Sequence, residues 1–372
     1  MKHSIWTKLT LILFAALILA VPLCWLLPQR DFSPTERRYL AKAPKLTDQD
    51  VRRWTYGTDV EAYFADHLPL RDALVGIDAY VTLLTGRQVS RDVWMDADGY
   101  LVEAPMPREE QGLKKRLNKI AALGETTGLR PFVLAVPSTG YIRQERLPNL
   151  LGRLYPDEAL LKVLEETQGL TSVNIADTFR QQGQNWYYAT DHHWNGLGAF
   201  AAYEAYMAAA GHAALSYDDF SHDTLEGYTG STLSRSAWWL TKGDRLTVDI
   251  PHDTAVTITF SDREGTFDSL FFYEHLQSYD WYPLFIDGNH PLTVIENQAA
   301  PSDSPVLLMV KDSFGNTLTP LLVPSYRRIV MVDPRYYRGS VAEVCKEYGA
   351  QELLFCYSLE RLMTDANLQI IK

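Results

Sequence analysis

The chain has 372 residues, of which 46% are hydrophobic and 22% are charged, and its formal net charge is −11. This composition excludes an intrinsically disordered chain and allows a sizeable buried core. The acidic balance argues against nucleic-acid binding, which requires basic surface to neutralise phosphates, and it suits a neutral or sugar-like substrate better.

The first 30 residues form a region of their own. Lys2 and Lys8 precede a run from Leu9 to Leu27 that contains no charged residue. As a helix rising about 1.5 Å per residue, this run would be about 28 Å long, close to the hydrocarbon thickness of a bilayer. We predict an uncleaved signal-anchor over residues 1–30, with a cleaved signal peptide as the alternative. In both cases the remaining chain would work outside the cytoplasm.

Residues 31–90 are expected to form a stalk followed by an amphipathic helix. The stretch 28–55 is polar and contains Pro34 and Pro44. From Val60 to Leu84 apolar residues recur at helical spacing, which indicates a helix with one apolar side.

Residues 91–372 are expected to form one α/β domain. A β-hairpin is predicted from Trp94 to Val102, because Asp98-Gly99 lies between two short apolar stretches. Helical and strand patterns then alternate, and repeated β-α-β units predict a parallel sheet with helices on both faces. The expected helices are 109–127, 157–168, 196–210, 314–322 and 341–347, and the expected strands are 131–136, 173–175, 306–310, 328–332 and 352–356.

The stretch from about 216 to 298 interrupts this pattern. Leu246–Ile250 and Ala255–Phe260 alternate as strands do, and Asp287-Gly288-Asn289 marks a turn. We interpret the stretch as a β-rich insertion. It is a candidate lid or substrate-recognition surface, and a structural elaboration without a ligand role is the open alternative.

The three cysteines carry little information. Cys24 lies in the apolar N-terminal run, which leaves Cys345 and Cys356. A bridge between these two is one alternative, and buried thiols are the expectation.

The first stretch with catalytic chemistry is Asp191-His192-His193-Trp194-Asn195, directly before the predicted helix 196–210. In an extended loop, residues two apart point to the same side, so Asp191 and His193 are expected to meet while His192 points away. A carboxylate beside an imidazole fixes its tautomer and stabilises the imidazolium. Asn195 is the expected N-cap of the helix.

The second stretch is Lys311-Asp312-Ser313-Phe314-Gly315-Asn316, which joins a predicted buried strand to a helix. This junction places Ser313 at the carboxyl end of a parallel strand, where open α/β sheets bind ligands. The unpaired N–H groups of the helix N-terminus could stabilise an oxyanion. Serine needs a nearby base to act as a nucleophile, and the first stretch contains one.

Each feature also has a simpler interpretation. Ser313 could be a helix N-cap, and Asp191 with His193 a hydrogen bond at the surface. Two adjacent histidines and an aspartate could bind zinc, although no His-Glu-x-x-His pattern is present and we expect no metal. Asp312 could replace Asp191 as the partner of the base, but its position beside the serine suits a turn better.

These stretches resemble a known bacterial family. Tyr188–Asn195, with its Asp191-His192-His193-Trp194 signature, resembles the DHHW family, and so do the segments 59–84, 311–313 and 332–337. That family is similar to the alginate O-acetylation proteins, whose domains are SGNH-hydrolase-like. The resemblance implies an SGNH-like α/β domain in which Asp191 orients the base, His193 is the base and Ser313 is the nucleophile.

Lys311 departs from the family pattern, because SGNH enzymes carry glycine at that position. The oxyanion-hole residues therefore cannot be transferred, and Lys311 is expected to pair with a carboxylate rather than to hold substrate. Trp194, Asn316, Arg335 and Tyr336 are candidate substrate-binding residues.

The expected function is serine-dependent O-acetyl transfer to a cell-envelope or secreted polysaccharide through an acyl-enzyme. The resemblance implies no cofactor, and it implies a membrane-bound O-acyltransferase as the partner that supplies acetyl groups. Two alternatives stay open: a carbohydrate esterase with the same triad, and a non-catalytic polysaccharide-binding or assembly component.

Overall fold

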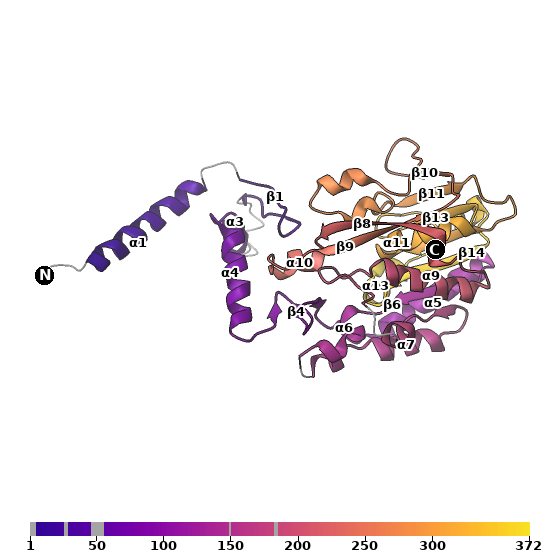
Figure 1. Ribbon diagram of the computed structural model, residues 1–372, viewed down its shortest axis with the longest axis horizontal. Coiled ribbons are helices and arrows are strands. Elements are labelled where there is room, and N and C mark those ends of the chain that lie inside the picture. The colour runs from indigo at the N-terminus through magenta and orange to yellow at the C-terminus, as the bar shows by residue number, and fades with distance from the viewer. Residues whose placement is uncertain (1–4, 26–28, 46–55, 149, 182–184) are drawn as a thin grey trace. The chain divides into compact units, whose positions relative to one another are not determined.

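The computed structural model describes residues 5–25, 29–45, 56–148, 150–181 and 185–372 (Figure 1). The chain divides into two compact units. The smaller unit comprises residues 1–91 and 234–239, and the larger unit comprises residues 92–233 and 240–372.

The smaller unit combines helices with short strands. In the described residues, no helix is both long and apolar enough to cross a membrane, so the predicted membrane span is not supported. Residues 26–28 and 46–55 of the predicted stalk lie outside the described residues. The elements are α1 (Ile5–Cys24), α3 (Tyr56–Asp66), α4 (Arg71–Leu84), β1 (Phe32–Ser33), β2 (Arg38–Tyr39) and β3 (Val89–Ser90).

The helical pattern expected from Val60 to Leu84 forms two helices rather than one. The break lies between α3 and α4, where Pro69 lacks the N–H that a continuous helix needs. Leu70 follows with a φ of 59°, a left-handed conformation that is uncommon for a residue with a side chain. Apolar spacing survives such a break, which is why periodicity alone did not reveal it.

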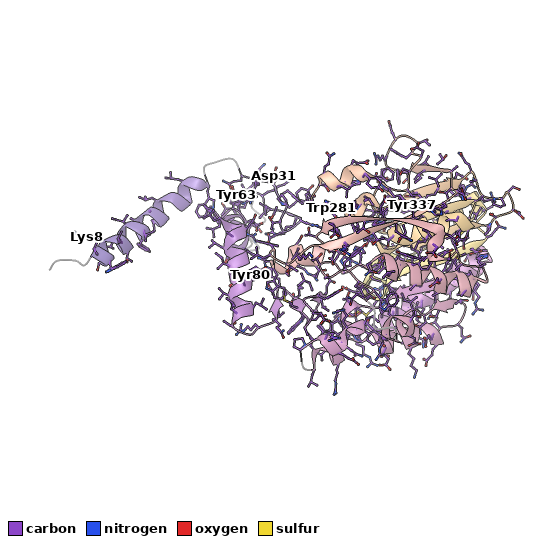
Figure 2. The ribbon with its side chains drawn as sticks, viewed as in Figure 1. Lys8, Asp31, Tyr63, Tyr80, Trp281 and Tyr337 are labelled. Atoms are coloured by element: carbon purple, nitrogen blue, oxygen red, sulfur yellow. The ribbon has the colours of Figure 1, made fainter. Side chains whose placement is uncertain are left out.

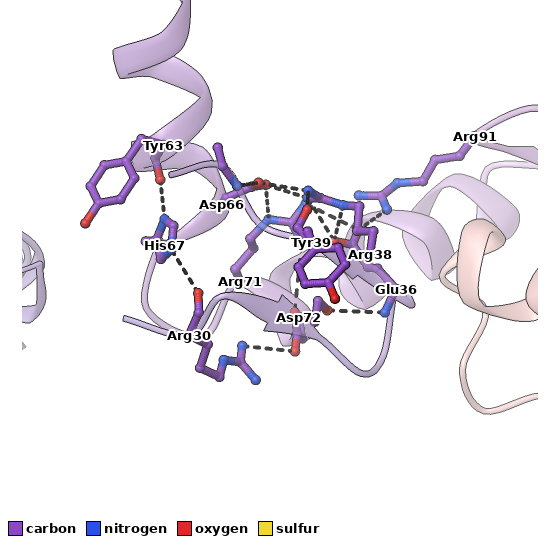
Figure 3. Close-up of polar contacts among 12 residues, drawn as sticks. Arg30, Glu36, Arg38, Tyr39, Tyr63, Asp66, His67, Arg71, Asp72 and Arg91 are labelled. Atoms are coloured by element: carbon purple, nitrogen blue, oxygen red, sulfur yellow. Dashed lines mark hydrogen bonds and ion pairs between the residues drawn. The ribbon is translucent and has the colours of Figure 1, made fainter. Parts of the chain in front are cut away.

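A cluster of charged side chains links the β1–β2 hairpin to the α3–α4 junction (Figure 3). Glu36 is almost fully buried and pairs with Arg38, with Arg91 and with Arg71, whose nearest N···O distance is 2.6 Å. Asp66 accepts hydrogen bonds from Arg38 and from the backbone N–H of Ala41, and the contact with Arg38 lowers the pKa of Asp66 to about 2. The junction is thus held by ion pairs.

The core of the larger unit is a seven-stranded sheet with the order β10-β11-β13-β12-β14-β6-β7. The five strands from β13 to β7 are parallel to their neighbours, whereas β10 and β11 are antiparallel at one edge. The predicted parallel sheet is therefore correct for its central part. The strands are β6 (Phe132–Val136), β7 (Thr171–Val173), β10 (Val256–Phe260), β11 (Leu292–Asn297), β12 (Val306–Lys311), β13 (Arg328–Val332) and β14 (Glu352–Ser358).

Apolar cores cover both faces of this sheet. Along β12, Leu307 and Met309 belong to one core and Leu308 and Val310 to the other, as the alternation of side chains along a strand requires. Helices α9 and α11 lie over the first face, and α5, α7, α12 and α13 over the second. The helices are α5 (Glu110–Thr127), α6 (Thr139–Ile142), α7 (Asp157–Glu166), α8 (Ala176–Gln181), α9 (Gly196–Ala210), α10 (Ser231–Ser236), α11 (Phe314–Leu322), α12 (Val341–Tyr348) and α13 (Leu359–Thr364).

The segment 216–298 contributes strands of two kinds. β8 (Phe220–Tyr228) and β9 (Asp244–Pro251) pair only with each other within the described residues, whereas β10 and β11 extend the central sheet. The predicted hairpin is present as β4 (Val93–Met95) and β5 (Leu101–Glu103). Cys345 and Cys356 are free, buried thiols, as expected.

Candidate active site

The first candidate loop is closed at its base by backbone pairing. Tyr187 and Trp194 form an isolated antiparallel bridge, and the N–H of Asn195 donates to the carbonyl of Trp186 over 2.9 Å. The Asn195 side chain accepts the N–H of Gly198 and so caps α9, as predicted. The closed loop holds the residues between these two points next to the helix N-terminus.

Asp191 and His193 are in direct contact inside this loop. One carboxylate oxygen, Oδ1, lies 2.5 Å from Nδ1 of the His193 ring and also accepts the backbone N–H of His193 over 2.9 Å. The loop is therefore a tight turn around the carboxylate and not the extended loop that we expected. Both residues are buried.

Ser313 lies on the other side of the same imidazole. Its hydroxyl is 2.7 Å from Nε2 of His193, although the two residues are 120 positions apart in the chain. Ser313 occupies the N-cap position of α11 but makes no capping hydrogen bond with its side chain. Unlike Asp191 and His193, Ser313 is partly exposed.

The second oxygen of Asp191 is held by a residue that the sequence analysis did not identify. Oδ2 accepts the backbone N–H of Ser231 over 2.6 Å. The preceding Gly230 packs so tightly that a Cβ added there would lie 2.2 Å from Cβ of Asp191. No spacing or motif connects these residues, because they are 40 positions apart and meet only through the fold.

Tyr282 is a second residue of the candidate site to which no sequence motif pointed. It begins a short 3₁₀ turn directly after Trp281, which Figure 2 labels, and its ring stacks on the ring of His193. Its hydroxyl donates to the backbone carbonyl of Ser313 over 3.2 Å. One buried side chain thus contacts both the candidate base and the candidate nucleophile.

His192 does not point away, as the alternation argument predicted. Its ring centroid lies 4.0 Å from that of His193, and its Nδ1 lies 3.0 Å from the hydroxyl of Ser231 and 3.5 Å from Asp191. The tight turn keeps both imidazoles on the same side. Asp191, His192 and His193 are therefore near enough to hold a metal ion, since their ligand atoms lie within 4.8 Å of one another. Binding one through His193 would disrupt its contact with Asp191 or with Ser313.

Burial and neighbouring charges set the protonation of the pair. Burial raises the pKa of Asp191, but the adjacent histidines and their hydrogen bonds outweigh it and hold the pKa well below its ordinary value. Burial and the charge of His192 lower the pKa of His193, against the opposing effect of Asp191. The ionised carboxylate can only accept, so Nδ1 of His193 carries the proton and the free lone pair of Nε2 faces Ser313.

The turn that carries Ser313 uses most of its N–H groups internally. Phe314 N–H donates to the Asp312 carboxylate, and the N–H groups of Gly315 and Asn316 donate to the carbonyls of Asp312 and Ser313. Asp312 also accepts from Ser358, so it shapes the turn and does not replace Asp191. The oxyanion donors expected from the helix N-terminus are thus largely occupied in the described turn.

Lys311 is fully buried and its ammonium group donates to Asn289 over 2.9 Å and to Asn316 over 2.6 Å. The nearest carboxylate is that of Asp333 at 4.0 Å, which forms its close ion pair with Arg335 instead. Burial lowers the pKa of Lys311 to about 8. The expected carboxylate pairing is therefore secondary to hydrogen bonds with two side-chain amides.

The candidate substrate-binding residues differ in their access to solvent. Trp194 is fully buried and donates to Thr317 over 2.6 Å, and Asn316 is fully buried beside Lys311. Both lie in the core and have no exposed surface that a substrate could contact in this structure. Tyr336 is exposed, and Arg335 is partly exposed beside Asp333. Both keep access to solvent.

Two protein-family models match parts of this chain, and both matched ranges include Asp191 and His193. Residues 167–332 match a family model described as DHHW protein. The resemblance to the DHHW family is confirmed. Residues 88–236 also match a model described as SGNH hydrolase-like domain, acetyltransferase AlgX. A comparison with curated proteins gives no match.

Solved structures share the fold of this chain. A DHHW family protein from Eubacterium siraeum DSM 15702 is 20% identical with a TM-score of 0.66, over 76% of this chain and 95% of that one. PatB1 from Bacillus cereus is 20% identical with a TM-score of 0.63, over 75% of this chain and 99% of PatB1. These similarities show a common fold.

Proposed function

We propose that this protein is a serine-dependent O-acetyltransferase that acts on a cell-envelope or secreted polysaccharide. The observation that carries the proposal is the position of His193, whose two ring nitrogens contact Asp191 and Ser313. This is the arrangement in which a carboxylate orients an imidazole and the imidazole activates a hydroxyl. The match of residues 88–236 to an acetyltransferase family model supports acetyl as the transferred group.

The first half of the reaction forms the acyl-enzyme. The Ser313 oxygen attacks the acetyl carbonyl of a donor ester while Nε2 of His193 takes the hydroxyl proton, and Asp191 stabilises the resulting imidazolium. His193 then returns the proton to the leaving oxygen of the donor, which departs as an alcohol and leaves Ser313 acetylated. The backbone N–H of Ser313 is suited to stabilise the oxyanion, since the next three N–H groups are occupied within the turn.

The second half transfers the acetyl group. A polysaccharide hydroxyl gives its proton to His193 and attacks the acetyl carbonyl, and His193 protonates the departing Ser313 oxygen. If water takes the place of the sugar hydroxyl, the same residues produce a carbohydrate esterase. The transferase and the esterase therefore use the same triad and differ only in the acceptor, which is a sugar hydroxyl in the first and water in the second.

A sulfonyl fluoride tests the nucleophile directly. Bacillus cereus PatB1, which shares the fold, has been solved with a sulfonyl adduct. We expect phenylmethylsulfonyl fluoride to add once to this protein, at Ser313, and Ser313→Ala to remain unmodified in intact-mass measurements. Ser340→Ala, which removes the cap of α12, is a matched serine control that should still be labelled.

The acceptor is tested by incubating the protein with p-nitrophenyl acetate, with and without candidate oligosaccharides. Acetylated sugar detected by mass spectrometry, dependent on Ser313, supports transfer. Acetate release that no oligosaccharide changes supports the esterase. If Ser313→Ala changes neither acetate release nor acetylation in cells, the protein is a non-catalytic binding or assembly component.

The proposal also covers where in the cell the protein works and what supplies its acetyl groups. We infer that the larger unit works outside the cytoplasm of a bacterium, attached to the membrane through residues 9–27 or released after cleavage. Since acetyl-CoA is cytoplasmic, a membrane-bound O-acyltransferase would supply the acetyl groups. Protease treatment of intact spheroplasts tests the orientation: digestion of the larger unit from outside is expected, and full protection would contradict it.

A further inference from the structure

Four apolar residues of α4 and Leu70, the residue directly before it, form an exposed row in the smaller unit. Their exposed fractions are 80% for Leu70, 48% for Leu74, 59% for Ile77, 51% for Val81 and 86% for Leu84. Single exposed apolar residues are common at protein surfaces, but a continuous row of five marks an interaction surface. We call these five residues the α4 stripe.

The opposite side of α4 is already packed. Gly76 and Ala79 are buried there, and a Cβ at Gly76 would lie 3.3 Å from the ring of Trp239. The indole N–H of Trp238 donates to the carbonyl of Ala79 over 3.2 Å. The helix cannot turn the α4 stripe inward without losing these contacts, so the stripe stays exposed within the described residues of the unit.

The spacing of the α4 stripe indicates what kind of partner fits. Successive members are 4, 3, 4 and 3 residues apart. An average repeat of about 3.5 residues keeps an apolar row facing a second helix in a left-handed coiled coil. Leu74 and Val81 take the first apolar position of this heptad repeat, and Leu70, Ile77 and Leu84 take the second.

The flanks of the α4 stripe argue against a lipid surface. Helices that lie on membranes carry Lys and Arg along their polar side. Within α4, all of whose residues are described, the exposed charge is Asp78. The single basic residue of the helix, Arg71, is largely buried and pairs with Glu36 at 2.6 Å.

We propose that the α4 stripe pairs with the α4 stripe of a second copy of this chain, with the two helices parallel. In a parallel pair, Ala73 faces Asp78 of the second copy and Tyr80 faces Thr85, so no like charges meet. An antiparallel pair centred on Ile77 would place the two Asp78 carboxylates opposite each other, which costs energy. The stripe contains no polar residue that would select a different helix.

The size of the surface sets the strength of the pairing. The five side chains of both copies would remove on the order of 1,000 Å² from water, near the lower limit for specific interfaces. We therefore expect a dimer whose fraction depends on protein concentration. This inference is independent of the proposed acetyl transfer, because it concerns only the smaller unit.

Disulfide trapping tests the parallel arrangement in the full-length chain. In a Cys24→Ser background, the remaining native thiols of Cys345 and Cys356 are buried. Val81→Cys should form a dimer on mild oxidation in membranes, because equivalent positions meet only in a parallel pair. Thr58→Cys, exposed on α3, is the matched control. Equal cross-linking at 58 and 81 would overturn the proposal.

Size measurements test the dimer itself. The mass of the detergent-solubilised wild-type chain should rise with concentration toward two copies. Val81→Asp should keep it at one copy, whereas Ala62→Asp, the same kind of change at an exposed α3 position, should behave as wild type. A wild-type mass of one copy at every concentration, or a dimer that survives Val81→Asp, contradicts the proposal. So does quenching of a fluorophore at position 81 by spin-labelled phosphatidylcholine, which would identify lipid as the occupant.

Discussion

The imidazole of His193 stacks on the phenol ring of Tyr282, with ring centroids 3.8 Å apart and planes inclined by 16°. The stacked ring leaves His193 little freedom to rotate away from Ser313. Tyr282 comes from the segment 216–298, as do Gly230 and Ser231 beside Asp191. This segment therefore supports the candidate triad at two points.

Replacing Tyr282 should affect the position of the base. Tyr282→Ala is expected to lower kcat for an aryl acetate by about 10²-fold, since small displacements of a catalytic group cost this much. Tyr282→Phe keeps the stacked ring and loses only the hydrogen bond to Ser313, so its kcat should stay within a few-fold of wild type. Equal losses in both variants would show that the hydroxyl, and not the stacking, is what matters.

Asp191→Asn removes the negative charge of the carboxylate while keeping the size of the side chain. The amide cannot accept from both His193 and Ser231 as the carboxylate does, so His193 loses its oriented tautomer. The expected loss in kcat is about 10⁴-fold, the size seen for this change in the serine-protease template. Asp249→Asn is a control, because the buried carboxylate of Asp249 also pairs with a histidine, the more exposed His222, 2.7 Å away and outside the triad. Its kcat should remain near that of wild type.

The pH dependence follows from the lowered pKa of His193. The base works only when neutral, so kcat/KM should rise with pH, with an apparent pKa below 6.5, and should level off at neutral pH. Since the charge of His192 contributes to the lowering, His192→Asn should shift the midpoint to higher pH. A profile with a midpoint above 6.5 in the wild type contradicts this assignment.

Gly230→Ala tests the tight contact beside Asp191. The added methyl would lie 2.2 Å from Cβ of Asp191, so the loop or the carboxylate must move. We expect a loss of about 1–3 kcal/mol in the free energy of unfolding and a fall in kcat of about 10²-fold. Gly57→Ala, where no atom lies within 4 Å of the added Cβ, should leave both unchanged. Chemical denaturation and steady-state kinetics measure the two effects.

A chelator distinguishes the triad from a metal site. Because both ring nitrogens of His193 contact Asp191 and Ser313, catalysis by this arrangement requires no ion. Extensive dialysis against EDTA should leave kcat unchanged, whereas added Zn²⁺ should inhibit by competing for His193. Loss of activity on dialysis and its recovery with Zn²⁺ would instead assign Asp191, His192 and His193 to a metal centre.

The amino-acid sequence by itself determined the features that depend on residues close together in the chain. Alternation and helical spacing predicted most elements of the larger unit to within two residues, and helices α9 (196–210) and α11 (314–322) have the bounds expected for them. Asn195 caps α9 because a cap needs only the next three residues of the chain. The DHHW resemblance pointed to Asp191, His193 and Ser313 for the same reason, since each lies in a short local motif.

Only the tertiary structure decided which of these motifs meet. The 2.7 Å contact between Ser313 and His193 depends on β12 and α9 packing in one domain, and no local pattern records that packing. Tyr282, Gly230 and Ser231 reach the site from a segment whose sequence shows strand alternation and a turn but no catalytic motif. The position of Asp191 in its turn also depends on a long-range contact, the hydrogen bond from the N–H of Ser231. Periodicity encodes which face of an element is apolar, whereas the partner of each side chain is set by long-range packing.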